Sequence, residues 1–86
     1  MKNHTKIYLD HFGYDETDFI ACEVCSAQAV DIHHIEARGM GGDPSGRKDV
    51  IKNLQALCRP CHVKFGDKKQ YKTMLIEKHN NKLAKN

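Results

Sequence analysis

The sequence predicts a small α+β domain in which a metal site joins a two-stranded hairpin to the helix that follows it. Three observations favour this class: the chain has only 86 residues, short β-branched segments lie between helix-like segments, and four cysteines form two Cys-x-x-Cys pairs. A chain of this length buries too little apolar surface for a hydrophobic core alone to give more than marginal stability. We therefore expect a single domain, residues 1–86, that a bound metal stabilises.

The first expected element is a helix over residues 3–13. Asn3 is suited to the N-cap of this helix, and Gly13 is suited to its end. Its apolar face consists of Tyr8, Leu9 and Phe12. Together with a polar turn over residues 15–18, the helix is expected to form an N-terminal flank, residues 1–19, to the metal-binding core.

A hairpin is expected to follow. The β-branched residues between 28 and 35 favour a strand there, and a second short strand is expected at 54–57. The glycine-rich loop between them cannot continue a strand, and it allows the backbone to pass close to a ligand. This loop contains Gly39, Gly41, Gly42, Pro44 and Gly46. The pattern is typical of a hairpin with a long connection.

Two helices complete the predicted fold. One begins after Cys58, with Pro60 in its first turn, and is interrupted at Gly66. The other covers residues 68–84. Its apolar stripe, which we interpret as core packing, consists of Tyr71, Met74 and Leu75.

The cysteines are the strongest signal in the sequence. Cys22 and Cys25 form the first pair, Cys58 and Cys61 form the second, and 32 residues lie between the pairs. In the cytoplasm, where we expect this chain, such pairs indicate zinc rather than disulfides. A compact zinc ribbon has only about 15–20 residues between its pairs, so the longer insertion here must be a substructure. We therefore expect a structural Zn²⁺ that clamps the base of the hairpin to the following helix.

Three histidines lie inside or beside the cysteine frame, and a structural zinc site does not need them. His33 and His34 are adjacent near the end of the first strand, and His62 directly follows Cys61. Neighbouring helix residues point about 100° apart, so His62 should face the hairpin if Cys61 faces the zinc. One strand histidine and His62 would then form an open site for a catalytic ion, with the remaining histidine as general base. The strand pleat does not decide which histidine has which role. The remaining histidines, interpreted as structural or exposed, are His4, His11 and His79.

Charge is distributed unevenly along the chain. Residues 1–31 carry two lysines against six acidic residues, whereas residues 32–86 carry twelve Lys or Arg against five acidic residues. A basic segment that also contains the histidine cluster suits a polyanion such as nucleic acid. Charge alone leaves a solvated lysine-rich helix open as the alternative. No apolar stretch approaches the roughly 20 residues of a membrane span, so we expect no membrane partner.

Four segments together resemble the HNH endonuclease family. They are Cys22-Glu-Val-Cys25, Asp31-Ile-His-His-Ile35, Gly39-Met-Gly-Gly42 and Asn53-Leu-Gln-Ala-Leu-Cys-Arg-Pro-Cys-His62. The resemblance covers residues 20–66, and the order His, Asn, His inside a four-cysteine frame carries it. It implies the ββα-metal (His-Me finger) fold, a structural zinc ion and one catalytic divalent ion. Residues 67–86 would then form a C-terminal helical flank.

The resemblance also implies roles for individual residues. By position, His34 matches the general base that deprotonates the attacking water, and His33 and His62 match ligands of the catalytic ion. Asn53 matches the residue that fixes the loop and orients the base. The implied reaction is one-metal hydrolysis of DNA, which gives 5′-phosphate and 3′-hydroxyl ends. Imidazole ligands favour Mn²⁺, Ni²⁺ or Zn²⁺ over Mg²⁺, although abundance favours Mg²⁺.

Phosphate contacts are expected from basic residues around the hairpin and the second cysteine pair, and such contacts position DNA without reading its sequence. The candidates are Arg38, Arg47, Lys48, Lys52 and Arg59. A domain of 86 residues offers little surface for reading a long site. We therefore expect a homodimer, or a partner protein of a phage or mobile element, to supply specificity. A bacterial or phage-encoded cytoplasmic protein is the expected setting.

The sequence leaves two other functions open. A non-catalytic zinc-dependent nucleic-acid-binding module explains the cysteines and the basic segment, but it gives His33, His34 and Asn53 no role. A purely structural or protein-interaction zinc domain explains the cysteines alone. Metal-dependent cleavage of plasmid DNA separates a nuclease from the first alternative. If the protein does not bind nucleic acid, or if its binding does not depend on salt, the purely structural or protein-interaction zinc domain is indicated.

Overall fold

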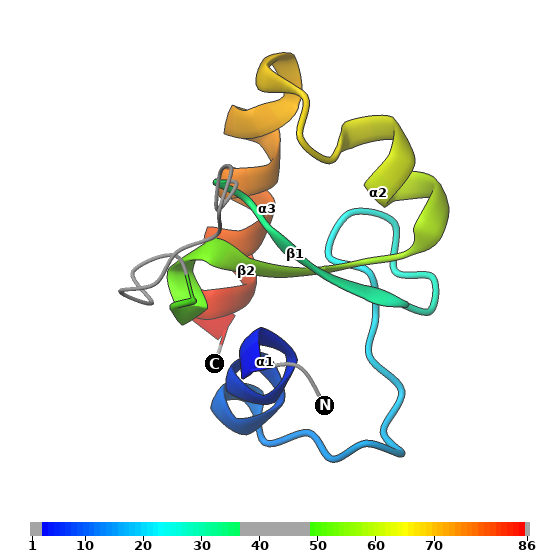
Figure 1. The fold of residues 1–86 in the computed structure, drawn as a ribbon, viewed down its shortest axis with the longest axis vertical. Helices are drawn as coiled ribbons and strands as arrows, with labels where there is room; N and C mark the ends of the chain where they lie inside the picture. The colour runs from blue at the N-terminus through cyan, green and yellow to red at the C-terminus, as the bar shows by residue number, and fades with distance from the viewer. Residues whose placement is uncertain (1–2, 37–48, 86) are drawn as a thin grey trace.

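The computed structural model describes residues 3–36 and 49–85 (Figure 1). Its helices and strands, in chain order, are α1 (Asn3–Phe12), β1 (Asp31–His34), β2 (Leu54–Leu57), α2 (Arg59–Phe65) and α3 (Lys72–Lys85). Two short 3₁₀ helices, η1 (Ile51–Asn53) and η2 (Lys69–Tyr71), precede β2 and α3. Two strands followed by a helix, with a further helix on each side, form the small α+β fold that the sequence predicts.

The antiparallel hairpin lies at the centre of the molecule. Asp31 of β1 is opposite Leu57 of β2, and His34 is opposite Leu54. All four residues of β2 are buried because the strand is covered on both faces. On one face Leu54 and Ala56 pack against Tyr8 of α1. On the other face Leu57 packs with the cysteines and Leu75 of α3, and Figure 1 shows α3 passing behind the hairpin.

The observed β1 is shorter than the strand predicted over residues 28–35. The ladder with β2 begins only at Asp31. The residues before Asp31 pair partly with the segment that precedes the cysteine turn, which we define as residues 22–26 with Cys22 and Cys25. Gln28 forms an isolated bridge with Ala21, and the N–H of Ala29 donates to the carbonyl of Ile20 at 2.8 Å. Residues 28–30 thus connect the cysteine turn to the hairpin.

The predictions for the helices are largely confirmed. Gly13, at φ +74°, ends α1, and Pro60 lies in the first turn of α2, which ends at Gly66. The last helix begins later than predicted, at Lys72, because η2 replaces its first turn. Leu75 is buried in the core, and Met74 packs against the same cluster, so the apolar stripe is core packing.

A buried polar network connects the flanking helices α1 and α3 with the segments between them. The carboxylate of Glu23, about 1% exposed, accepts hydrogen bonds from the Tyr8 hydroxyl at 2.5 Å and from Nδ1–H of His79 at 2.8 Å. Nε2–H of His79 donates to the Ile51 carbonyl at 2.6 Å. Both ring nitrogens of His79 face acceptors, and this arrangement favours the imidazolium form of the ring. The network ties α1, the cysteine turn, η1 and α3 together.

The network makes stability depend on pH. Burial lowers the pKa of His79, but its hydrogen bond to Glu23, the charge of Glu23 and the Ile51 carbonyl outweigh burial, so the pKa is raised above the usual 6.5. A raised folded-state pKa gives stabilisation that is complete below the unfolded pKa and is lost as pH rises through the folded one. We expect His79→Gln to lower the free energy of unfolding by about 3 kcal/mol at low pH, since it leaves a buried carboxylate unpaired.

Urea unfolding of the zinc-loaded protein and variant at pH 6 and pH 9 checks this prediction. The difference between the two proteins should shrink at pH 9. His11→Gln, on the exposed face of α1, is the matched control and should show no such change. A difference between wild type and His79→Gln that is the same at both pH values would contradict the proposed charge state.

Candidate metal centres and active site

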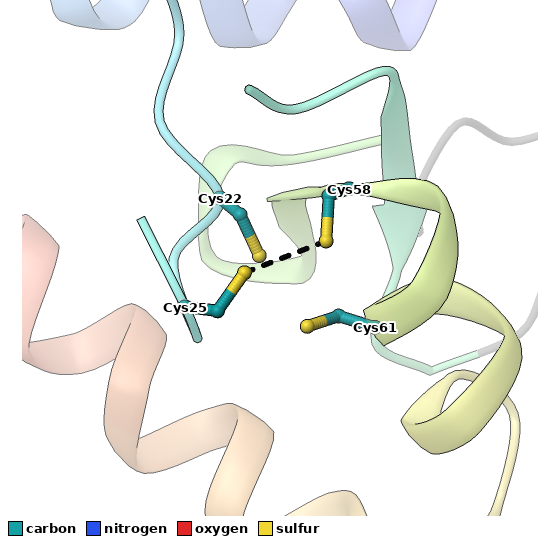
Figure 2. Close-up of side chains that lie close together, drawn as sticks. All are labelled: Cys22, Cys25, Cys58 and Cys61. Carbon is teal, nitrogen blue, oxygen red and sulfur yellow. Dashed lines mark hydrogen bonds between the residues drawn. The ribbon is translucent and has the colours of Figure 1, made fainter. Parts of the chain in front are cut away.

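The four cysteines converge between the cysteine turn and α2 (Figure 2). Cys22 and Cys25 lie in the turn before β1, Cys58 directly precedes α2, and Cys61 lies in the first turn of α2. Their sulfur atoms lie within 4.8 Å of one another, and Sγ of Cys25 and Sγ of Cys58 are 3.5 Å apart. Tetrahedral zinc with Zn–S bonds of about 2.3 Å places sulfurs roughly 3.8 Å apart. Four free thiols at this spacing are compatible with a structural zinc site.

The backbone of the cysteine turn prepares its first sulfur for metal binding. Ser26 adopts a left-handed conformation at φ +70°, which closes the turn so that its N–H donates to the Cys22 carbonyl at 3.0 Å. Burial raises the pKa of the Cys22 thiol, but N–H groups of Cys58, Cys25 and Val24 outweigh burial and lower the pKa to about 7. The thiolate is the form that binds a metal. The fold therefore favours the ligating form of Cys22 without help from other charges.

A second cluster of metal-binding side chains lies beside the first. His33 of β1, His62 of α2 and Asp67, which follows α2, place their ligand atoms within 4.8 Å of one another. The rings of His33 and His62 lie 4.8 Å apart between centroids. His33 is only 4% exposed, and its Nε2 has no hydrogen-bond partner within the described residues. A buried nitrogen without a partner costs about 1–3 kcal/mol, and a bound ion would remove that cost.

Asp31 fixes the orientation of the second histidine. Nδ1–H of His62 donates to Oδ2 of Asp31 at 2.9 Å, which leaves Nε2 as the nitrogen available to a metal. A carboxylate that accepts a hydrogen bond from one ring nitrogen fixes the tautomer and makes the other nitrogen a stronger metal ligand. Burial is the main cause that lowers the pKa of His33, and the charges of His62 and His34 lower it further, whereas Asp67 raises it. A neutral His33 is the form that can bind a cation.

His34 points to the other face of β1, as alternation along a strand requires. Its Nε2 lies 2.6 Å from Oδ1 of Asp49, so the carboxylate accepts a hydrogen bond from Nε2–H. Asn53 holds the chain just after β1: its Oδ1 accepts from the Glu36 N–H at 2.7 Å, and its Nδ2 donates to the Glu36 carbonyl at 3.0 Å. The backbone carbonyl of Asn53 also accepts from the N–H of Ile35 at 2.9 Å. Asn53 thus fixes the segment that carries His34.

A comparison with known protein families agrees with this arrangement. The sequence profile of the family described as HNH endonuclease matches residues 22–68. The chain belongs to the HNH endonuclease family. The match includes both cysteine pairs, His33, His34, Asn53 and His62, and the ββα-metal fold of the family agrees with the observed hairpin and helix. Searches of curated proteins and of solved structures found no match.

Asp67 is a candidate ligand of this HNH domain that sequence reasoning missed. It has φ +58°, a left-handed conformation that Asp tolerates better than most residues. This turn directs its carboxylate back toward His33 and His62. The signal that could have found it is an acidic residue directly after the glycine that ends the metal-binding helix.

Gly66 allows His62 to occupy its observed position. A Cβ at residue 66 would lie 2.5 Å from both Cδ2 and the carbonyl oxygen of His62. We expect Gly66→Ala to displace the His62 ring and to lower affinity for the second divalent ion by about tenfold or more, with the zinc of the cysteine site retained. Isothermal titration of the zinc-loaded variant with Mn²⁺ measures this. Lys64→Ala, exposed on the same helix, is the control, and equal Mn²⁺ affinities of the two variants would contradict the prediction.

The predicted DNA contacts of the HNH domain divide into two groups. Lys52 and Arg59 are exposed, and Nη2 of Arg59 lies 3.5 Å from Oδ1 of Asp31, so Arg59 is also next to the His62 side chain. Three predicted contacts lie outside the described residues, and these are Arg38, Arg47 and Lys48. The glycine-rich loop lies outside them too. Within the part of the chain that the structure describes, no helix has the length and apolar character needed to cross a membrane.

Proposed function

We propose that the protein hydrolyses DNA phosphodiester bonds as an endonuclease that uses one catalytic divalent ion. The observation that carries this proposal is the buried Nε2 of His33, which has no hydrogen-bond partner among residues 3–36 and 49–85. It lies beside a His62 ring whose Nδ1–H donates to Asp31. Two imidazoles with oriented nitrogens form an open site, which structural zinc sites do not have. Membership of the HNH endonuclease family supports a nuclease.

In this proposal His34 is the general base. Because Asp49 accepts a hydrogen bond from Nε2–H, Nδ1 of a neutral His34 carries the lone pair that can take the proton of an attacking water. Asn53 keeps this part of the chain in place through Glu36. A divalent ion held by His33, His62 and Asp67 would supply a Lewis acid for the scissile phosphate and the leaving oxygen. The carboxylate of Asp67 makes the ligand set harder than two imidazoles alone, which suits Mn²⁺ as well as Zn²⁺ or Ni²⁺.

The proposal extends to substrate contacts and domain limits. Lys52, Arg59 and the predicted basic residues of the long loop would contact phosphates. The catalytic core would consist of residues 20–66, the bounds expected from the sequence, together with Asp67 at the start of the C-terminal flank. A homodimer or a partner protein of a phage or mobile element would supply sequence specificity. The basic second part of the chain also fits a non-catalytic nucleic-acid-binding module, so the first experiment must separate cleavage from binding.

Plasmid cleavage with zinc-loaded protein tests the proposed function. Supercoiled plasmid is incubated with Mg²⁺, Mn²⁺, Ni²⁺ or Zn²⁺, with a sample without added ion as the control. We expect nicking that requires an added ion. If the protein binds the plasmid in a salt-dependent way but does not cleave it with any of the four ions, the nuclease proposal is wrong. That result would support the non-catalytic nucleic-acid-binding module.

Asp67 provides a test of the ion site itself. Asp67→Asn keeps a residue that tolerates φ +58°, but it removes the charged ligand. We expect Mn²⁺ affinity to fall by about tenfold or more, and His62→Ala should have a similar or larger effect, in both cases with one zinc retained per chain. Calorimetric titration of the zinc-loaded variants measures these affinities. Unchanged Mn²⁺ binding in both variants would rule out the proposed ligand set.

A further inference from the structure

A third cluster of metal-binding side chains lies on the opposite face of β1. His4 of α1, His34 of β1 and Asp49, which precedes η1, place their ligand atoms within 4.8 Å of one another. The ring centroids of His4 and His34 are 4.6 Å apart. The side chains of His34 and Asp49 are only 13% and 8% exposed. The mechanism proposed above uses His34 and Asp49 but gives His4 no role.

We propose that His4, His34 and Asp49 bind a second transition-metal ion, and that this ion inhibits the enzyme by withdrawing His34 from proton transfer. The ion binding stands on the side-chain cluster alone, whereas the inhibition rests on the proposed nuclease function. The site differs from the one at His33 because adjacent residues of β1 point to opposite faces. The His33 ring packs against the His62 ring of α2, and the His34 ring packs against the His4 ring of α1. The two sites share no ligand.

The donor set determines which ions would bind. Two imidazoles and one carboxylate bind Zn²⁺, Ni²⁺ or Co²⁺ more tightly than Mg²⁺. Nε2 of His34 and Oδ1 of Asp49 now lie at a hydrogen-bond distance of 2.6 Å. Around an ion with bonds of about 2.0 Å they would lie roughly 3.3 Å apart. A shift of this size requires only small side-chain rotations, and the ion would take the place of the shared proton.

The consequence follows from the chemistry of the imidazole. When Nε2 of His34 binds an ion, the proton of that ring moves to Nδ1, so Nδ1 can no longer accept a proton from a water molecule. Cleavage supported by Mg²⁺ should therefore be inhibited when Zn²⁺ or Co²⁺ is added. The inhibition should depend on His4, which does not belong to the proposed catalytic centre.

Titration of the zinc-loaded protein with Co²⁺ tests the binding. We expect two Co²⁺ ions per chain beyond the cysteine site in the wild type and one in His4→Ala. His4→Gln keeps a side chain of similar length and is the second variant in case His4→Ala folds poorly. It should also bind one Co²⁺ ion per chain beyond the cysteine site. His11→Ala, on the same helix but outside the cluster, is the matched control and should bind two. Co²⁺ stoichiometry and affinity in His4→Gln equal to those of His11→Ala would overturn the site.

Inhibition of cleavage is measured separately. With Mg²⁺ as the catalytic ion, Zn²⁺ is titrated into the wild type, His4→Gln and His11→Ala, and each rate is divided by the rate of the same variant without added Zn²⁺. We expect the inhibitory Zn²⁺ concentration to rise at least tenfold in His4→Gln only. Equal inhibition of all three proteins would overturn the inhibitory role. If the wild type cleaves no DNA under any ion, the nuclease proposal fails and the inhibitory role with it, while Co²⁺ stoichiometry still decides the binding site.

Discussion

Replacement of Cys61 by serine is expected to unfold the protein at room temperature. Cys61 is buried in the same core cluster as Cys22, Leu57 and Leu75, and a hydroxyl does not replace a thiolate as a zinc ligand. In small zinc domains the binding free energy is folding free energy, of order 10 kcal/mol. A domain of 86 residues has only about 5–10 kcal/mol of total stability to lose.

Circular dichroism and zinc analysis measure this effect. We expect Cys61→Ser to contain less than one zinc per chain and to lose most of its helical signal, and a strong chelator should do the same to the wild type. Gln28→Ala, an exposed residue close to the cysteine turn, is the control and should keep both zinc and helix. A zinc-free Cys61→Ser protein that melts at the wild-type temperature would show that the cysteines do not stabilise the fold.

Replacement of His34 by alanine is expected to reduce DNA cleavage by about 10²–10⁴-fold, the usual contribution of a general base. The zinc content should stay at one per chain, because His34 lies on the face of β1 away from the cysteines. Mn²⁺ affinity should also be retained, because the ion site proposed for catalysis contains His33, not His34. The effect should therefore appear in kcat rather than in ion binding.

Cleavage rates at saturating Mn²⁺ test this prediction, with His11→Ala as a control for loss of a histidine elsewhere. His33→Ala gives the complementary pattern, with weak ion binding and activity that partly returns at high Mn²⁺. If His34→Ala cuts as fast as the wild type, the base is another group. If it loses Mn²⁺ binding together with activity, the division of roles between the two histidines is wrong.

The parts of the fold set by local sequence were predictable. The spacing of Cys22, Cys25, Cys58 and Cys61 indicated the four-cysteine cluster, since two Cys-x-x-Cys pairs are the typical spacing of a four-thiolate metal site. Proline and glycine marked the ends of α2, as their backbone preferences require. Rotation along a helix correctly predicted that His62 faces the hairpin while Cys61 faces the other cysteines.

The parts that depend on long-range packing were not predictable. Asp67 approaches His33 only because a left-handed turn reverses the chain after α2. An acidic residue after the helix-ending glycine marks the turn, but it does not show that the carboxylate reaches β1. His4 was interpreted as structural or exposed, yet α1 packs so that its first turn meets His34. His79 was interpreted as structural or exposed, and it is buried, but its partner Glu23 lies 56 positions away. Sequence patterns describe neighbours along one element, and these contacts join different elements.

The buried Glu23–His79 pair also limits how the nuclease core can be transplanted. The family profile covers only residues 22–68, yet Glu23 depends on Tyr8 before that span and on His79 after it. A fusion protein carrying the matched segment alone would leave Glu23 without either partner. It would also expose to water the apolar residues of β2 that Tyr8 and Leu75 cover, and that exposure costs several kcal/mol, at roughly 1.5–3 kcal/mol for each large apolar side chain. The segment that matches the family profile is therefore shorter than the segment that is needed for a stable fold. A functional graft has to include α1 and α3, even though neither helix supplies a residue to the proposed catalytic centre.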